Sequence, residues 1–204
     1  MTPRLRAVLA ATISAISFAA IAPAASASSR PDPTQIAAAL PAEQSAAFKQ
    51  LAQSQQELTA QILADPDFAV PGREQALTAK YRQVAVTKTA SDGTNRSLAA
   101  SGSRSSWVSQ NWTILGITYA KVTTTVGYFY NGSSATAIDY CVGNAVNYVP
   151  LRTINYYPTT SVNSDGTVTC RTNWTLDRPL QSTAYGVQGL RVNGNGTIVR
   201  TWYL

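Results

Sequence analysis

The residues of this chain that could do chemistry are few. The 204 residues include no histidine, so no Ser-His-Asp or Cys-His arrangement can form, nor a zinc site with imidazole ligands. Two cysteines are too few for a structural zinc ion or an iron–sulfur cluster. We therefore expect the protein to bind no metal and no cofactor.

The carboxylates of the C-terminal half are also sparse. Glycoside hydrolysis needs two carboxyl groups about 5–10 Å apart, and residues 107–204 contain only Asp139, Asp165 and Asp177. Asp165 precedes a glycine in a turn, and Asp177 precedes an Arg-Pro pair, so capping or ion pairing explains both. The only lysine of this region, Lys121, does not lie in a Ser-X-X-Lys motif. We predict that the protein is not an enzyme.

Cys141 and Cys170 are the only thiols. In an exported chain such a pair predicts a disulfide. This disulfide would close a loop of about 30 residues and stabilise the fold by roughly 3–4 kcal/mol. A reactive thiol is the weaker alternative, because no histidine is present to lower its pKa.

The aromatic residues are the remaining candidates for recognition. Neighbouring residues of a strand point to opposite faces, so one member of Tyr156-Tyr157 and one of Trp202-Tyr203 are expected at the surface. Exposed Tyr and Trp beside Asn, Thr and Arg are typical of sugar stacking or partner recognition, whereas ordinary rim aromatics are the structural alternative. The candidate binding residues are Tyr119, Arg152, Tyr156, Tyr157 and Trp202.

The first 27 residues have the pattern of a secretory signal peptide. Arg4 and Arg6 precede an uncharged apolar stretch from Ala7 to Ala22, and Ala25-Ser26-Ala27 supplies the small residues of a cleavage site. The alternative is a membrane anchor, but this stretch is short and rich in Ala and Ser. We expect cleavage after Ala27 and a secreted, extracellular protein with no stable membrane anchor.

The charge that remains after cleavage is mildly positive. The mature chain keeps 14 basic and 10 acidic residues, a net charge of +4, and the whole excess lies in residues 99–204. Such a charge suits an anionic cell wall, polysaccharide or membrane surface. The arginines and lysines are scattered singly, which argues against nucleic-acid binding.

The N-terminal part of the mature chain, residues 28–86, has helical composition. Residues 41–64 are rich in Ala, Gln, Leu and Glu with apolar residues at helical spacing, and a shorter helix is expected after Pro71-Gly72. Residues 87–106 are dominated by Ser, Thr, Gly, Asn and Ala, which predicts a flexible linker. We hypothesise that cleavage in this linker releases residues 28–86 as a pro-segment; the alternative is that the linker stays intact.

Residues 107–204 have the alternation of β-strands. Residues 117–130 and 167–176 alternate apolar with polar side chains, and Asn131-Gly132 and Asn193-Gly194 are strong hairpin signals. The predicted fold class is mainly β: an antiparallel β-sandwich, or a small barrel, preceded by a short α-helical segment.

A faint internal repeat occurs at an offset of 62 residues. It predicts two related halves that face each other across one core, with coincidence in a Thr-, Asn- and Gly-rich chain as the alternative. The repeat matches Asn111-Trp112-Thr113 with Asn173-Trp174-Thr175, Gly127 with Gly189, and Asn131-Gly132 with Asn193-Gly194.

These features favour a secreted, non-catalytic β-sandwich module that binds a surface glycan, an envelope component or a partner protein. A first alternative is a membrane-active or antibacterial toxin, in which the hairpin of residues 117–146 enters a bilayer and residues 28–106 mask it. A second is a secreted protease inhibitor that presents residues 146–157 as an exposed loop. The sequence predicts no oligomeric state.

Overall fold

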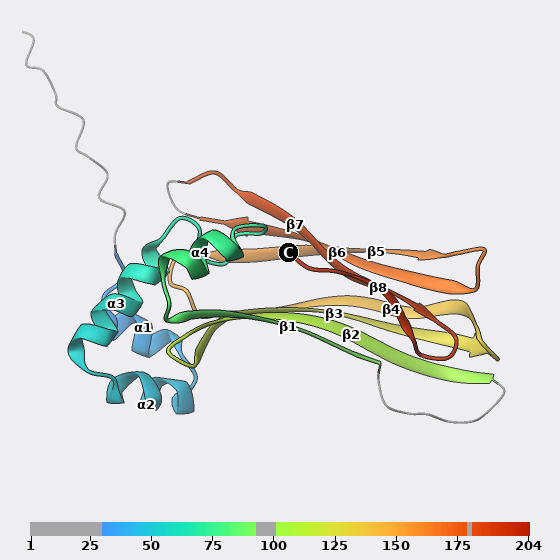
Figure 1. The fold of residues 1–204 in the computed structure, drawn as a ribbon, viewed down its shortest axis with the longest axis horizontal. Helices are drawn as coiled ribbons and strands as arrows, with labels where there is room; N and C mark the ends of the chain where they lie inside the picture. The colour runs from blue at the N-terminus through green and yellow to red at the C-terminus, as the bar shows by residue number, and fades with distance from the viewer. Residues whose placement is uncertain (1–29, 93–100, 179–180) are drawn as a thin grey trace, which may run out of the picture.

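The computed structural model describes residues 30–92, 101–178 and 181–204, and in them two four-stranded antiparallel sheets lie one over the other, with four helices at one end (Figure 1). The predicted mainly β, sandwich-like fold with a preceding helical segment is confirmed. The predicted signal peptide, residues 1–27, lies outside the described residues, as do residues 93–100 of the predicted linker.

The helices are α1 (Pro33–Ala39), α2 (Ala42–Gln50), α3 (Gln53–Ala64) and α4 (Glu74–Lys80). The continuous helix expected over residues 41–64 is wrong, because Leu51 and Ala52 have extended backbones. The side chain of Gln55 accepts the Ala52 backbone N–H at 3.1 Å, so a new helix begins there.

Each sheet is a simple meander in which neighbours along the chain are neighbours in space. The first sheet contains β1 (Val84–Asp92), β2 (Ser101–Ile114), β3 (Ile117–Asn131) and β4 (Ser134–Asn147). The second contains β5 (Thr153–Val162), β6 (Thr167–Asp177), β7 (Ala184–Asn193) and β8 (Ile198–Trp202). The hairpin predicted over residues 117–146 forms β3 and β4.

The flexible linker predicted over residues 87–106 is wrong wherever the structure describes it. Residues 87–92 belong to β1, which pairs with β2 from Val84↔Ile114 to Asp92↔Ser106, and residues 101–106 belong to β2. The sequence lacked an apolar signal because β1 is an edge strand, and most of its side chains beyond Val86 are exposed.

The helical segment shares its core with the sheets. Ile36, Phe48 and Ile62 from the helices are at most 1% exposed and belong to the same apolar cluster as Trp112 and Trp174. The helices therefore close one end of the sandwich (Figure 1), and residues 33–80 and the strands fold as one body.

The predicted disulfide is confirmed and joins the two sheets. Cys141 lies in β4 and Cys170 in β6, and their Cα atoms are 5.7 Å apart. Cys170 is fully buried in the second apolar cluster, where it packs with Val126 and Leu190. The covalent link therefore fixes the edge of the first sheet to the interior of the second.

Candidate functional site

Tyr119 is not a surface residue. The register between β2 and β3 shifts at Trp112, which pairs with Ala120, while Thr113 pairs with Thr118, so Tyr119 is the extra residue of a β-bulge. The bulge turns the Tyr119 ring into the core under the helices, where it is 0% exposed and burial raises the pKa of its hydroxyl. The prediction that it contributes to a binding surface is therefore wrong.

Arg152 has a structural position as well. It lies in the short connection between β4 and β5, and its guanidinium donates to the carbonyls of Leu63, Asp65 and Phe68, at 2.9 Å and 3.0 Å for the first two. Burial, with nearby Arg178, lowers the pKa of Arg152 to about 10. The prediction of Arg152 as a binding residue is corrected: it attaches the α3–α4 connection to the sheets.

The exposed loop expected over residues 146–157 is also wrong. The strands β4 and β5 leave only residues 148–152 unpaired, and Val149 among them is buried. Leu151, which is 71% exposed, adopts a positive φ of 62° in this tight turn.

The adjacent aromatic pairs divide between the two faces as expected. The Tyr156 ring faces the interior, 5.3 Å from the Trp174 ring, and lies against Gly143 of β4. Tyr157 points outward and is 70% exposed. Trp202 also lies on the outer face of the second sheet, whereas Tyr203 packs against the second apolar cluster.

The outer face of the second sheet carries a groove of about 300 Å³ at the end away from the helices, and we name it the arginine groove. It is lined by Thr159, Thr160, Ser161, Asn163, Thr169, Arg171, Arg191, Arg200 and Trp202. Its wall is thus made of hydroxyl, amide and guanidinium groups around one indole ring.

Trp202 is the centre of this groove. The guanidinium carbons of Arg171 and Arg200 lie 4.3 Å and 4.9 Å from the centre of its ring system. In the strand register Trp202 is opposite Gly189, which in turn is opposite Arg171. Because Gly189 has no side chain, the space between Arg171 and Trp202 stays open.

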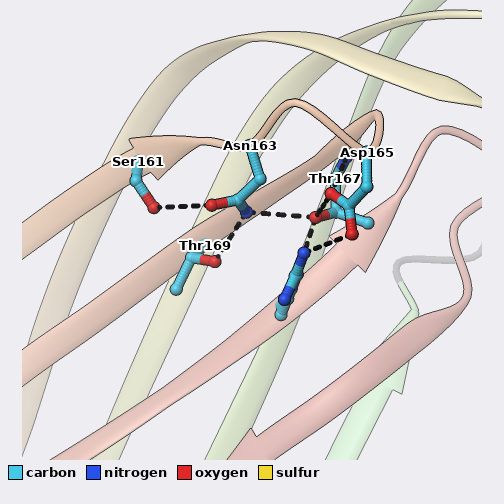
Figure 2. Close-up of polar contacts among 6 residues, drawn as sticks. Ser161, Asn163, Asp165, Thr167 and Thr169 are labelled. Atoms are coloured by element: carbon cyan, nitrogen blue, oxygen red, sulfur yellow. Dashed lines mark hydrogen bonds and ion pairs between the residues drawn. The ribbon is translucent and has the colours of Figure 1, made fainter.

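Arg191 is held in the groove by the β5–β6 turn. Its Nε donates to the Thr167 hydroxyl at 2.7 Å, and its Nη2 forms an ion pair with Asp165. The Thr167 hydroxyl donates to Asp165 at 2.6 Å and also accepts from Asn163 at 3.0 Å (Figure 2). These hydrogen bonds, that of Arg191 foremost, lower the pKa of Asp165 to about 2.

The turn also supplies polar groups to the groove wall. Asn163 Nδ2 donates to the Thr169 hydroxyl at 3.0 Å, and the Ser161 hydroxyl donates to Asn163 Oδ1 at 3.2 Å (Figure 2). Figure 2 shows these side chains gathered beside one turn, so the network fixes both the turn and the direction of Arg191.

The charge of the groove is strongly unbalanced. Arg191 lies directly opposite Arg200 in the register, and such like-charged pairs destabilise a sheet. Within the described residues, the carboxylate of Asp165 neutralises only Arg191, and neither Arg171 nor Arg200 has a carboxylate within 4 Å. The groove therefore presents two positive charges beside an aromatic ring.

The first sheet has the same backbone arrangement without these charges. There Ser105 is opposite Gly127 and Gly127 is opposite Tyr140, 62 residues before Trp202, as Gly127 precedes Gly189 by the same interval. The Tyr140 hydroxyl donates to or accepts from Ser105 at 3.1 Å across the glycine. The fold thus accepts a neutral residue where the second sheet has Arg171.

This correspondence supports the internal repeat, with one difference. Trp112 pairs with Ala120, but Trp174 pairs with Gly186, which is four positions further along when counted at the offset of 62. The third and fourth strands of the two meanders keep equivalent partners, while the second strand is displaced.

The sequence predicted Trp202 and Tyr157 but not the arginines. The alternation of β6 places Arg171 on the polar face with Thr169 and Asn173, which was the one available signal. That Arg191 and Arg200 join it depends on the β6–β7 and β7–β8 registers, which no local pattern specifies.

Within the described residues, no group of three or more Cys, Asp or Glu side chains is placed to hold a metal ion. No helix in this part of the chain is both long and apolar enough to span a membrane. Comparison with protein-family models, with curated proteins and with solved structures found no match.

Proposed function

We propose that this protein is a secreted, non-catalytic β-sandwich module that binds an anionic glycan of a cell surface or envelope through the arginine groove. The observation that carries the proposal is the indole ring of Trp202 between two arginines that no carboxylate within the described residues neutralises. A carboxylate, sulfate or phosphate group fits the fork of donors on a guanidinium. The face of a sugar ring fits against an indole.

A cost to the fold supports a functional reading of these arginines. Arg191 and Arg200 repel each other across the β7–β8 register. At the equivalent place in the first sheet the same architecture forms with serine and tyrosine. A bound anion would offset this repulsion, so ligand binding explains why the charges lie together.

The chemistry of the groove favours a glycan over a protein partner. Protein interfaces are usually anchored by side chains that fill apolar pockets. Thr159, Ser161, Asn163 and Thr169 instead offer hydroxyl and amide groups, which suit the many hydroxyls of a sugar.

Titration calorimetry of the full mature chain tests the proposal. The probes are polygalacturonate, dextran sulfate and neutral dextran. We expect binding of at least one anionic polymer, none of neutral dextran, and affinity that falls as salt rises. The R171Q/R200Q variant should bind at least about tenfold more weakly, because each lost charge-assisted contact costs about 1 kcal/mol or more.

Two matched controls accompany this double variant. Arg82→Gln removes an exposed arginine outside the groove, and Lys121→Gln removes an exposed charge from the outer face of the first sheet. Both should bind like the parent protein. Equal loss in the controls, or no binding of any anionic polymer, would show that the groove is not an anion site.

The secreted location is supported by the N-terminal pattern and by the disulfide, which is typical of oxidising compartments. The mass and N-terminal residue of the protein recovered from culture medium test it. We expect a chain that begins at Ser28 and contains no free thiol. Protein retained in the cell with residues 1–27 attached would contradict export.

A further inference from the structure

The arginine groove is one end of a longer surface. Along the outer face of the second sheet, cross-strand neighbours form successive rows: Tyr185 with Thr175, then Tyr157 with Asn173, then Arg171 with Trp202, then Arg191 with Arg200. From Tyr185 to Arg191 is six residues of β7, or about 20 Å at the rise of a strand. The face is therefore long enough for several sugar units.

The rings of this surface are unusually open. Tyr157 and Tyr185 are 70% and 74% exposed, whereas Tyr156, the neighbour of Tyr157, packs on Trp174. The two open tyrosines lie on the same face as Trp202 and lead to it along the strand direction. Between them Asn173 and Thr175 supply amide and hydroxyl groups, which alternate with the rings.

The charge changes along the same direction. The arginines lie at the end near the β5–β6 turn, and Asp177 lies at the helix end, where it accepts hydrogen bonds from Asn155 at 3.1 Å and Thr183 at 2.9 Å. A uniformly anionic chain would meet this carboxylate at its far end. A chain that is acidic at one end and neutral at the other meets complementary groups throughout.

We infer that the ligand is a linear oligosaccharide that lies along β6 and β7, with an acidic sugar against Trp202 and the arginines and neutral sugars on Tyr157 and Tyr185. This inference rests on the proposed function and gives it a direction. Trp202 and the arginines recognise the acidic unit, and the tyrosines measure the length of the neutral part.

A length series of ligands tests the inference with the full mature chain. The probes are β-1,4-linked oligosaccharides, from disaccharide to hexasaccharide, with a single glucuronate at one end, and the same series without the carboxylate. We expect affinity to rise by about tenfold from disaccharide to pentasaccharide and then to level off, because two aromatic stacking contacts are added and the face ends. The uncharged series should bind far more weakly at every length.

Variants separate the two parts of the surface. The Y157A/Y185A variant should bind the acidic disaccharide like the parent protein but lose the gain with length. Tyr140→Ala, an exposed tyrosine on the other sheet, is the matched control and should keep that gain.

The failure of the inference differs from the failure of the proposed function. If the acidic disaccharide binds but longer ligands bind no better, the inference is wrong and the groove remains an anion site. If the uncharged series binds equally well, or an acidic peptide binds more tightly than any oligosaccharide, the proposed orientation is also wrong. If neither oligosaccharide series nor any anionic polymer binds, the proposed function itself is wrong.

Discussion

Arg171 occupies the space that a side chain on Gly189 would need. A β-carbon on Gly189 would lie 2.9 Å from Cγ of Arg171 and only 2.4 Å from the carbonyl oxygen of Cys170. The second contact is with backbone, which cannot rotate away. The open space between Arg171 and Trp202 therefore depends on glycine at this position.

The first prediction compares Gly189→Ala with Gly127→Ala. We expect Gly189→Ala to destabilise the fold by about 1–3 kcal/mol, because the added methyl group forces the backbone apart. At Gly127 the nearest atoms belong to the Tyr140 ring, which is 41% exposed and can swing outward at the cost of one hydrogen bond. The expected change there is at most about 1 kcal/mol.

Urea unfolding of the two variants beside the parent protein measures both changes. The comparison is matched, since each glycine lies opposite an aromatic residue in the third and fourth strands of its meander. A larger loss for Gly127→Ala than for Gly189→Ala would contradict the account of the groove.

The second prediction concerns Arg152, whose role the structure corrects. Arg152→Met removes a guanidinium that donates to three backbone carbonyls and leaves these carbonyls without their donors. We expect a loss of about 2–4 kcal/mol in the free energy of unfolding. The glycan affinity of the folded variant should not change, because the groove lies at the opposite end of the sandwich from the helices.

Arg82→Met, at an exposed position just before β1, is the control for the general effect of removing an arginine. Urea unfolding and calorimetry on both variants separate stability from binding. A drop in affinity for Arg152→Met with unchanged stability would restore Arg152 as a binding residue.

The third prediction concerns acid. The pKa of Asp165 lies at about 2, below its ordinary value of 3.8, chiefly because Arg191 donates to the carboxylate. A carboxyl group whose pKa is lowered by folding stabilises the folded state above its unfolded pKa, and this contribution is lost as pH falls through the folded pKa. We therefore expect the contribution of Asp165 to be complete above about pH 4 and to disappear near pH 2.

Thermal unfolding between pH 7 and pH 2 measures this contribution. Asp165→Asn should unfold at a lower temperature than the parent protein at neutral pH, and the two should converge near pH 2. Asp139→Asn, at an exposed position of β4, should follow the parent protein throughout. A gap for Asp165→Asn that stays constant with pH would mean that the ion pair with Arg191 does not stabilise the fold.

The fold was accessible from the sequence where local chemistry decides structure. Asn131-Gly132 and Asn193-Gly194 lie at hairpin turns, and Gly132 has the positive φ that such turns favour. Prediction failed where the signal is not local. The strand β1 carries little apolar alternation because it is an edge strand, and Tyr119 departs from the alternation of β3 because of a bulge.

The candidate site was only partly accessible for the same reason. Trp202 and Tyr157 are recognisable as members of adjacent aromatic pairs, one of which must face outward. Arg171, Arg191 and Arg200 come from three strands, and pairing registers alone bring them together. No composition or spacing rule predicts such a cluster, because each arginine by itself is an ordinary polar-face residue.

The fourth prediction concerns the disulfide. The link between Cys141 and Cys170 spans 29 residues, and a closed loop of that size stabilises a fold by about 3–4 kcal/mol through the entropy of the unfolded chain. We expect the C141A/C170A variant, and the reduced parent protein, to lose about this much in urea unfolding. A loss below about 1 kcal/mol would mean that the two apolar clusters alone fix the sheets against each other. Because β6 is paired on both sides, by β5 and β7, the groove keeps its floor without the link, and the glycan affinity of the folded variant should equal that of the parent protein.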